Sequence, residues 1–153
     1  MDVFEEFETD ARHFAALAAS SVHYKKMYDR ISGLAKIGVW EFDLVTEKLI
    51  WTDTVYDLFE IPRNSVLQRS DTLKFYNERS LKEMERLRSE AITSGSGFAM
   101  DILIRTASGA DRWIRLTADI EQENGRSVRI FGTKQDITAC PPSAFNRQTG
   151  LVK

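Results

Sequence analysis

The stretch from residue 97 to residue 138 limits the possible folds more than any other part of the chain. It contains three strand-like runs, GFAMDILIRT, RWIRLTADIEQ and VRIFGTKQDIT, separated by the short turns ASGAD and ENGRS. Both turns contain glycine, and strands joined by short glycine-containing turns are the signal for an antiparallel meander. We therefore expect a sheet built around these runs, with the preceding elements packed on its faces.

Each of the first two runs has one apolar face, because side chains two residues apart point to the same side of a strand. The apolar sets are Phe98, Met100, Ile102 and Ile104 in the first run, and Ile114, Leu116, Ala118 and Ile120 in the second. A turn of odd length centred on Ser108, with Gly109 in a left-handed conformation, brings both sets to one face of the sheet.

The cross-strand pairs favour the same register. The odd turn places Asp101 opposite Arg115, and Leu103 opposite Trp113, and both are favourable pairs. An even turn would instead bury Arg115 beside Ile102. We expect an apolar inner face, and an outer face whose Leu103 and Trp113 are covered by another element.

The first third of the chain alternates helix and strand signals. Residues 4–34 favour one long helix that Gly33 ends. Residues 37–52 favour a β-hairpin, because two runs rich in β-branched and aromatic residues flank a polar turn. The segment TVYDLFEI that follows predicts a short helix ended by Pro62.

A second helical region precedes the meander. A helical turn is expected over residues 72–76. The segment Ser80–Glu83 then fits a capping box, which predicts a helix that begins there and runs to about Thr93. The order of elements predicts an α+β fold with a single antiparallel sheet. Residues 139–153 have no periodicity and predict a flexible tail or linker.

The long N-terminal helix carries a narrow apolar stripe. The stripe has a break in phase before Tyr24, and the residues expected to form the dimer contact are Phe4, Phe7, Phe14, Leu17, Tyr24 and Ile31. Such a helix can pair with a second copy of the chain through the stripe, and we predict a homodimer formed through this helix and the outer sheet face. The alternative, an amphipathic helix that covers its own domain, stays open.

Length, charge and composition exclude several classes of protein. The chain of 153 residues is long enough for one domain with a sizeable core. Its formal net charge is −2 and its cations are dispersed, so no basic stripe indicates binding to nucleic acid or to an anionic membrane. No apolar run approaches the roughly 20 residues that span a bilayer, and the acidic N-terminus does not predict a secretory signal. The single cysteine, Cys140, cannot form an internal disulfide, so we expect a cytoplasmic protein.

Five short sequence motifs follow one another between residues 35 and 138. They are AKIGVWEFD at 35–43, WT at 51–52, YDLF at 56–59, RWI at 112–114 and GTKQDIT at 132–138. In this order they resemble the PAS domain family, in the branch with a tryptophan in each half of the sheet. The last motif looks like the exit motif of that family. The sequence FYNER at 75–79 departs from the His-Pro-acid-Asp segment of many members, and Ser108-Gly109 replaces the usual Asp-Gly turn.

The resemblance implies a five-stranded antiparallel sheet with helices on one face, over residues 35–138. This domain would be preceded by the helix of residues 1–34 and followed by the tail of residues 139–153. It implies a sensor or interaction module and not an enzyme, and such modules pass their signal to an effector such as a histidine kinase or a diguanylate cyclase. The chain contains no effector, so we expect an excised N-terminal sensor or a stand-alone module. Asp136 and Thr138 of the exit motif would transmit the signal. In an equally weighted alternative, Asp136 forms an Asx turn that only ends the strand.

The residues at the cofactor positions of the family disfavour haem and flavin. Haem-binding relatives use a histidine on the long helix, and residues 80–93 contain none. Flavin-binding relatives need amides on the inner sheet face, where this chain has Ile104, Ile114 and Lys134, and these cannot make the paired hydrogen bonds of a flavin edge. They also need a cysteine before the long helix, and this chain has none there. No group of His, Cys and acidic residues has metal-ligand spacing, and both histidines precede the globular region, so catalysis is not expected either.

Two hypotheses remain for the core. In the first, a small molecule binds in a pocket lined by Phe59, Phe75, Phe98, Met100, Ile102, Ile114, Leu116, Ile130 and Lys134. In the second, the same side chains fill the core, and the domain is a ligand-free dimerisation and relay spacer. Lys134 should share the inner face with Ile130 and Gly132, and a buried lysine is costly unless it is paired. It therefore holds an anionic ligand such as a carboxylate, or it extends to a surface acid.

Overall fold

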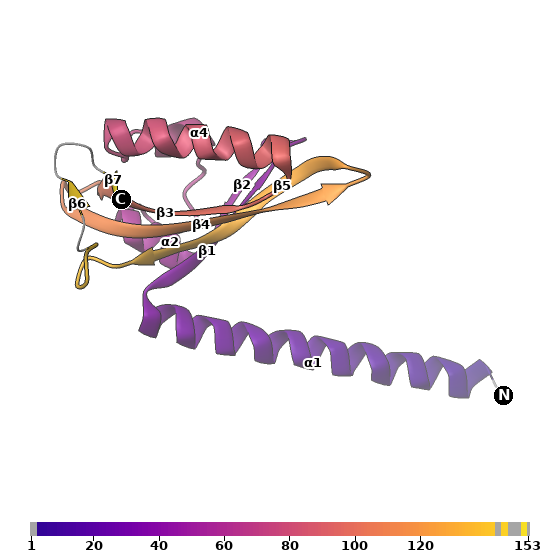
Figure 1. Cartoon of the computed structure of the whole chain (residues 1–153). Helices are drawn as coiled ribbons and strands as arrows, with labels where there is room; N and C mark the ends of the chain where they lie inside the picture. The colour runs from indigo at the N-terminus through magenta and orange to yellow at the C-terminus, as the bar shows by residue number, and fades with distance from the viewer. Residues whose placement is uncertain (1–2, 143–144, 147–150, 153) are drawn as a thin grey trace. The chain divides into compact units, whose positions relative to one another are not determined.

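The predicted meander forms one side of a five-stranded antiparallel sheet, whose strand order is β2-β1-β5-β4-β3. The strands are β1 (Ile37–Asp43), β2 (Leu49–Trp51), β3 (Phe98–Arg105), β4 (Asp111–Glu123) and β5 (Arg126–Asp136). The computed structural model describes residues 3–142, 145–146 and 151–152. The chain divides into two compact units, residues 1–34 and 35–153, and the sheet belongs to the second (Figure 1).

The strands β3 and β4 pair in the register that a turn with an odd number of residues predicts. Asp101 lies opposite Arg115, and Leu103 lies opposite Trp113. The loop between the strands covers residues 106–110 and has Gly109 at φ +92°, in the left-handed region that favours glycine. Arg115 forms an ion pair with Asp101, with 2.9 Å between Nε and Oδ1. The expectation of an odd turn centred on residue 108 is therefore confirmed.

Three helices pack against the inner face of this sheet. They are α2 (Asp53–Phe59), α3 (Arg69–Leu73) and α4 (Glu78–Ser94), and Figure 1 shows α4 lying across the sheet. The alternation read from the sequence holds, because Ile102, Ile114 and Ile130 are at most 1% exposed. Complete burial of such a side chain stabilises the fold by about 1.5–3 kcal/mol, so the apolar face fixes both the register and the side that the helices cover.

The helix α4 begins two residues earlier than predicted, and a different residue caps it. Asn77 is the N-cap, and its side-chain oxygen accepts a hydrogen bond of 3.0 Å from the Arg79 backbone N–H. The predicted cap, Ser80, is fully buried inside the helix. Its supposed partner Glu83 instead accepts a 2.9 Å hydrogen bond from Arg86 Nε. The capping-box prediction is therefore wrong, because the asparagine three residues upstream takes the cap position.

Other helix boundaries also differ from the predictions. The helical turn expected over 72–76 is α3, three residues earlier, where Gln68 and Asp71 form a capping box. The helix α2 ends at Phe59, because its C-cap Glu60 is left-handed with φ 57°, and so it stops before Pro62. The N-terminal helix α1 (Val3–Ala35) continues through Gly33, so the prediction that Gly33 ends it is wrong.

Two further strands lie in the segment for which a flexible tail was predicted. They are β6 (Phe145–Asn146) and β7 (Leu151–Val152), which pair antiparallel. Residues 143–144, 147–150 and 153 lie outside the described residues, and for them the tail stays a prediction. Within the part of the chain that the structure describes, no helix is long and apolar enough to cross a membrane.

Candidate functional site

A small cavity of about 40 Å³ lies between the inner face of the sheet and the helices α3 and α4. Aromatic and aliphatic side chains form most of its wall, with Trp40 and Trp51 directly opposite each other on β1 and β2. Three cationic side chains complete the lining, and no acidic side chain is among its lining residues in the described part of the chain. A cavity of this composition is electropositive and suits an anion.

Lys134 lies on the inner face of β5, as the sequence predicts. Its strand neighbours are Gly38 on β1 and Leu116 on β4. The side chain is only 5% exposed, and its ammonium lies 4.7 Å from the ring centre of Trp40, with Trp51 and Phe59 at about 6 Å. Cation–π contacts of this kind stabilise a desolvated cation, but they supply no acceptor for its N–H groups.

No carboxylate lies within 4 Å of the Lys134 ammonium among the described residues. The alternative in which this side chain extends to a surface acid is therefore wrong, because it stays buried among aromatic rings. Burial, together with the positive charge of Arg69, lowers the pKa of Lys134 to about 7. A nearby anion would reverse this effect, since an opposite charge favours the protonated form.

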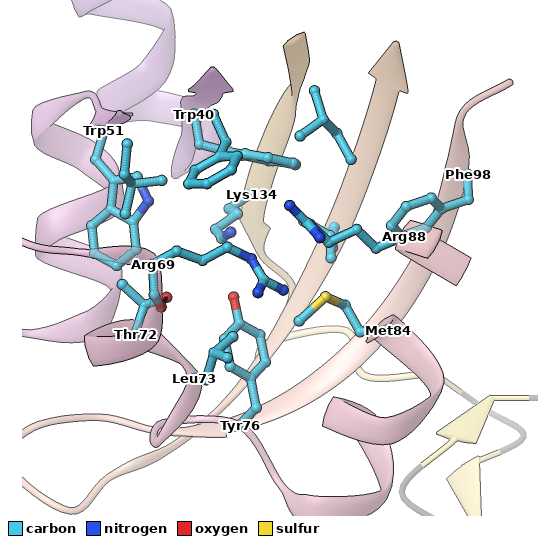
Figure 2. Close-up of a pocket in the computed structure, with 14 residues that line it drawn as sticks. Trp40, Trp51, Arg69, Thr72, Leu73, Tyr76, Met84, Arg88, Phe98 and Lys134 are labelled. Atoms are coloured by element: carbon cyan, nitrogen blue, oxygen red, sulfur yellow. Dashed lines mark hydrogen bonds between the residues drawn. The ribbon is translucent and has the colours of Figure 1, made fainter. Parts of the chain in front are cut away.

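Two arginines enter the same cavity from different helices. Arg69 comes from α3 and forms an ion pair with Glu85 of α4. Arg88 comes from α4, and its guanidinium lies 5.4 Å from the ring centre of Phe42. Figure 2 shows the two side chains entering the cavity from opposite sides, with the guanidinium of Arg88 directed toward Lys134 and that of Arg69 near the Tyr76 hydroxyl. Burial is the main cause that lowers the pKa of Arg88, with the charge of Arg69 adding to it. The charge of Glu85 opposes these two effects on the pKa of Arg88, but within the described chain no carboxylate lies within 4 Å of its guanidinium.

Two neutral donors lie beside these cations. The Tyr76 hydroxyl points into the cavity (Figure 2), and burial raises the pKa of this phenol, so it stays protonated. The Nε1–H of Trp40 is buried and has no hydrogen-bond acceptor in the described structure. A buried donor without an acceptor costs about 1–3 kcal/mol. The cavity wall therefore combines positive charge with neutral hydrogen-bonding groups, and the described lining contains no carboxylate.

The exit of β5 is held by a short chain of hydrogen bonds. The carboxylate of Asp136 accepts from the Thr138 backbone N–H at 2.9 Å and from the Thr138 hydroxyl at 2.5 Å. The same hydroxyl accepts from the Trp113 backbone N–H at 3.1 Å, and the Ile137 N–H donates to the Trp113 carbonyl at 2.9 Å. Asp136 thus forms an Asx turn, which was one of the two roles predicted for it. This turn joins the end of β5 to the start of β4.

The predicted pocket residues separate into two groups. Phe98, Leu116, Ile130 and Lys134 line the cavity. The others, Phe59, Phe75, Met100, Ile102 and Ile114, belong to the packed core or lie against it and do not line the cavity. Most of the predicted pocket is therefore solid core, and the space lies closer to α4 and β2.

The two arginines are the site residues that sequence reasoning did not find. Arg88 had a signal, because it lies four residues after Met84 and three before Ala91 and so interrupts the buried face of the helix. A cation on an apolar stripe points into the core or along it. Arg69 had no such signal, since residues 63–77 show no clear period.

The predicted stripe of α1 is exposed where the structure describes its side chains. Phe14 is 70% exposed and Tyr24 is 69% exposed, and Leu17 and Ile31 are exposed as well. Phe4 and Phe7 lie in the helix, but their side chains fall outside the described part. Dimerisation through this stripe stays a prediction, as do the absence of haem and flavin. Among the described residues, no group of three or more His, Cys, Asp and Glu side chains could hold a metal ion.

Comparison with known proteins identifies the fold. No protein-family model matches the chain. Sensor protein FixL of Bradyrhizobium diazoefficiens is 28% identical over 109 residues, which are 71% of this chain and 21% of that protein. The chain therefore spans about a fifth of the length of this curated relative.

Two solved structures share the arrangement of strands and helices. A sensory box histidine kinase/response regulator from Burkholderia thailandensis gives a TM-score of 0.62 at 14% identity, over 73% of this chain and 85% of that chain. The N-terminal domain of a diguanylate cyclase with PAS/PAC sensor, from Marinobacter aquaeolei, gives 0.62 at 15% identity, over 67% and 96%. At these identities the likeness concerns the fold.

Proposed function

This chain has the PAS fold, and from that premise we propose that it is the sensory module of a bacterial-type signal-transduction protein. In this proposal it has no catalytic activity, resides in the cytoplasm and forms a homodimer through α1 and the outer sheet face. It binds a small molecule in the cavity and relays the signal through β5 to an effector such as a histidine kinase or a diguanylate cyclase.

The continuity of β5 is the observation that carries the proposal. Lys134 lies in the cavity, and Asp136, two residues later on the same strand, holds the exit turn. Between them Gln135 pairs with Arg115 of β4 and Ile37 of β1, so the strand is central in the sheet. A displacement of Lys134 by a ligand would therefore reach the exit through one stretch of backbone without passing through a loop.

The small size of the cavity favours a second candidate function. Pockets for drug-sized ligands measure about 300–1,000 Å³, whereas this cavity measures about 40 Å³. The domain would then be a ligand-free spacer that pairs two chains and transmits a change imposed elsewhere. This candidate leaves Lys134, Arg88 and the Trp40 N–H without a function, and we therefore favour the sensory module.

A fusion to a kinase tests the relay. The whole chain would replace the sensory PAS domain of a histidine kinase, and autophosphorylation would be measured. We expect Lys134→Met and Asp136→Ala to change the rate at least twofold, since the first alters the cavity and the second removes the exit turn. Glu123→Gln, at the far end of β4, should leave the rate unchanged. Equal rates in all variants, with thermal unfolding confirming that each is folded, would count against the proposed function.

A further inference from the structure

We propose that the ligand of this cavity is a small carboxylate, whose negative group lies between Lys134, Arg88 and Arg69 and which enters through the outer groove beside α3 and α4. The proposal rests on the sensory function above and specifies its ligand. It is carried by the balance of charge at the cavity, by an unused hydrogen-bond donor, and by the shape of the space.

The charges around the cavity do not balance. Of its three cations, only Arg69 has a carboxylate within ion-pair distance in the described chain, Glu85, whose charge also acts on Arg88. The ammonium of Lys134 lies over the ring of Trp40, and the guanidinium of Arg88 lies over the ring of Phe42. Buried cations are normally paired, because an uncompensated charge is costly away from water. One further negative charge between them would offset one of these two unpaired charges, and no described side chain lies close enough to either to form an ion pair.

The donors favour an oxyanion over a halide. The Trp40 Nε1–H is buried without an acceptor, and the Tyr76 hydroxyl is a neutral donor on the same cavity. A carboxylate has two oxygens with about four acceptor positions, so one such group can accept from an ammonium and from a guanidinium together. The planar guanidinium of an arginine can also donate two parallel hydrogen bonds to a carboxylate, and a spherical ion does not match this geometry.

The volume restricts the ligand to a few atoms. A site that holds one water molecule needs about 10–15 Å³ on the same scale, so 40 Å³ admits about three water-sized groups. A carboxylate with one or two further carbon atoms has this size. Larger cofactors do not fit unless the core rearranges.

An outer groove provides the entrance. A second hollow of about 590 Å³ lies outside the cavity, and the two share Phe42, Arg69 and Arg88 as lining residues. The two arginines thus stand at the boundary between the groove and the interior. Glu47 is the one acid that lines the groove in the described chain, so positive charge predominates at the entrance.

The test is a titration of the full chain with sodium acetate, followed by the indole N–H signals in a ¹H–¹⁵N spectrum. The chain has three tryptophans. Trp40 and Trp51 line the cavity, and Trp113 does not, so it serves as an internal reference. Acetamide has the shape of acetate without the charge, and sodium chloride at the same ionic strength controls for salt.

We expect the Trp40 and Trp51 signals to shift and saturate with acetate, and not with acetamide or chloride. Lys134→Met and Arg88→Leu should each weaken acetate binding at least tenfold. Lys82→Met, an exposed lysine on α4, should leave it unchanged. The proposal is overturned if acetate and acetamide act alike, if acetate has no saturable effect, or if both cavity variants bind as the native chain does. In each of these cases a kinase fusion that still responds to Lys134→Met would leave the sensory function standing, with a ligand of another class.

Discussion

Replacement of Lys134 by methionine should stabilise the protein, and by an amount that depends on pH. Methionine keeps the length of the side chain and fits among aromatic rings, with contacts worth about 0.3–1.5 kcal/mol. It removes the charge, which the folded state accommodates poorly. The lysine has an ordinary pKa of 10.5 in the unfolded chain and a pKa of about 7 when folded.

The size of the effect follows from these two pKa values. Their difference corresponds to about 5 kcal/mol of destabilisation at low pH, at about 1.4 kcal/mol for each pKa unit. Between pH 7 and pH 10.5 the unfolded chain binds the proton and the folded chain releases it, so stability rises with pH across this window. The penalty is about 4 kcal/mol at pH 7 and about 2 kcal/mol at pH 9.

Lost contacts offset part of the gain. The cation–π interaction with Trp40 is worth about 1–2 kcal/mol at a desolvated site. We therefore expect Lys134→Met to raise the free energy of unfolding by about 2–3 kcal/mol at pH 7. For a domain of this size that is a rise in Tm of roughly 5–10 °C.

Urea unfolding at pH 7, 8 and 9, in a buffer free of carboxylates, measures the difference between the two proteins. The difference in the free energy of unfolding should decrease by about 2 kcal/mol from pH 7 to pH 9, because every other group titrates alike in the variant and in the native chain. Lys82→Met, which removes an exposed lysine from α4, should show almost no gap at any pH. A gap that does not change with pH, or a methionine variant less stable at pH 7, would refute the reasoning about the buried ammonium.

Three further predictions concern the scaffold. Gly132→Ala should lower the free energy of unfolding by about 1–3 kcal/mol or more, because its Cβ would lie 1.9 Å from the Thr117 carbonyl oxygen; an unchanged urea midpoint would contradict this. Asn77→Ala should cost about 1 kcal/mol by removing the cap of α4, and the same urea assay would show no loss if that cap is unimportant. Deletion of residues 1–32 should convert a dimer to a monomer in light scattering, because α1 carries the exposed apolar stripe; a dimer that survives the deletion would exclude this helix as the interface.

The sheet was predictable from the sequence because several independent signals agree on it. Three features require the same register. They are the odd length of the loop at Ser108, the pairing of Asp101 with Arg115 and the alternation of the apolar residues. A slip by one residue would expose a whole apolar face, so the sequence specifies this part strongly. The position of Lys134 on the inner face follows from the same alternation.

Local competition explains the boundaries that were not predicted. Asn77 and Ser80 are both good caps, and the choice between them depends on which one faces solvent, which only the packed structure decides. Gly33 lies within α1 because glycine tolerates helical backbone angles, at a cost of about 1 kcal/mol relative to alanine.

The cavity was predictable only in part. The sequence indicates which side chains point inward, but the space among them depends on how α3 and α4 lie on the sheet. Arg69 reaches the cavity from a helix of five residues without periodicity, and Arg88 does so from within an apolar stripe. The site therefore combines residues that are far apart in the sequence, and its positive charge becomes apparent only when they are brought together.

A crystal structure of the purified chain, grown with acetate, tests the central claim most directly, because it shows what occupies the space between Lys134 and Arg88. We predict a bound carboxylate whose oxygens lie within hydrogen-bonding distance of the Lys134 ammonium and of an arginine. A cavity closed by rearranged side chains, with Lys134 turned to solvent or paired with an acid of the chain itself, would contradict the account and favour the ligand-free spacer.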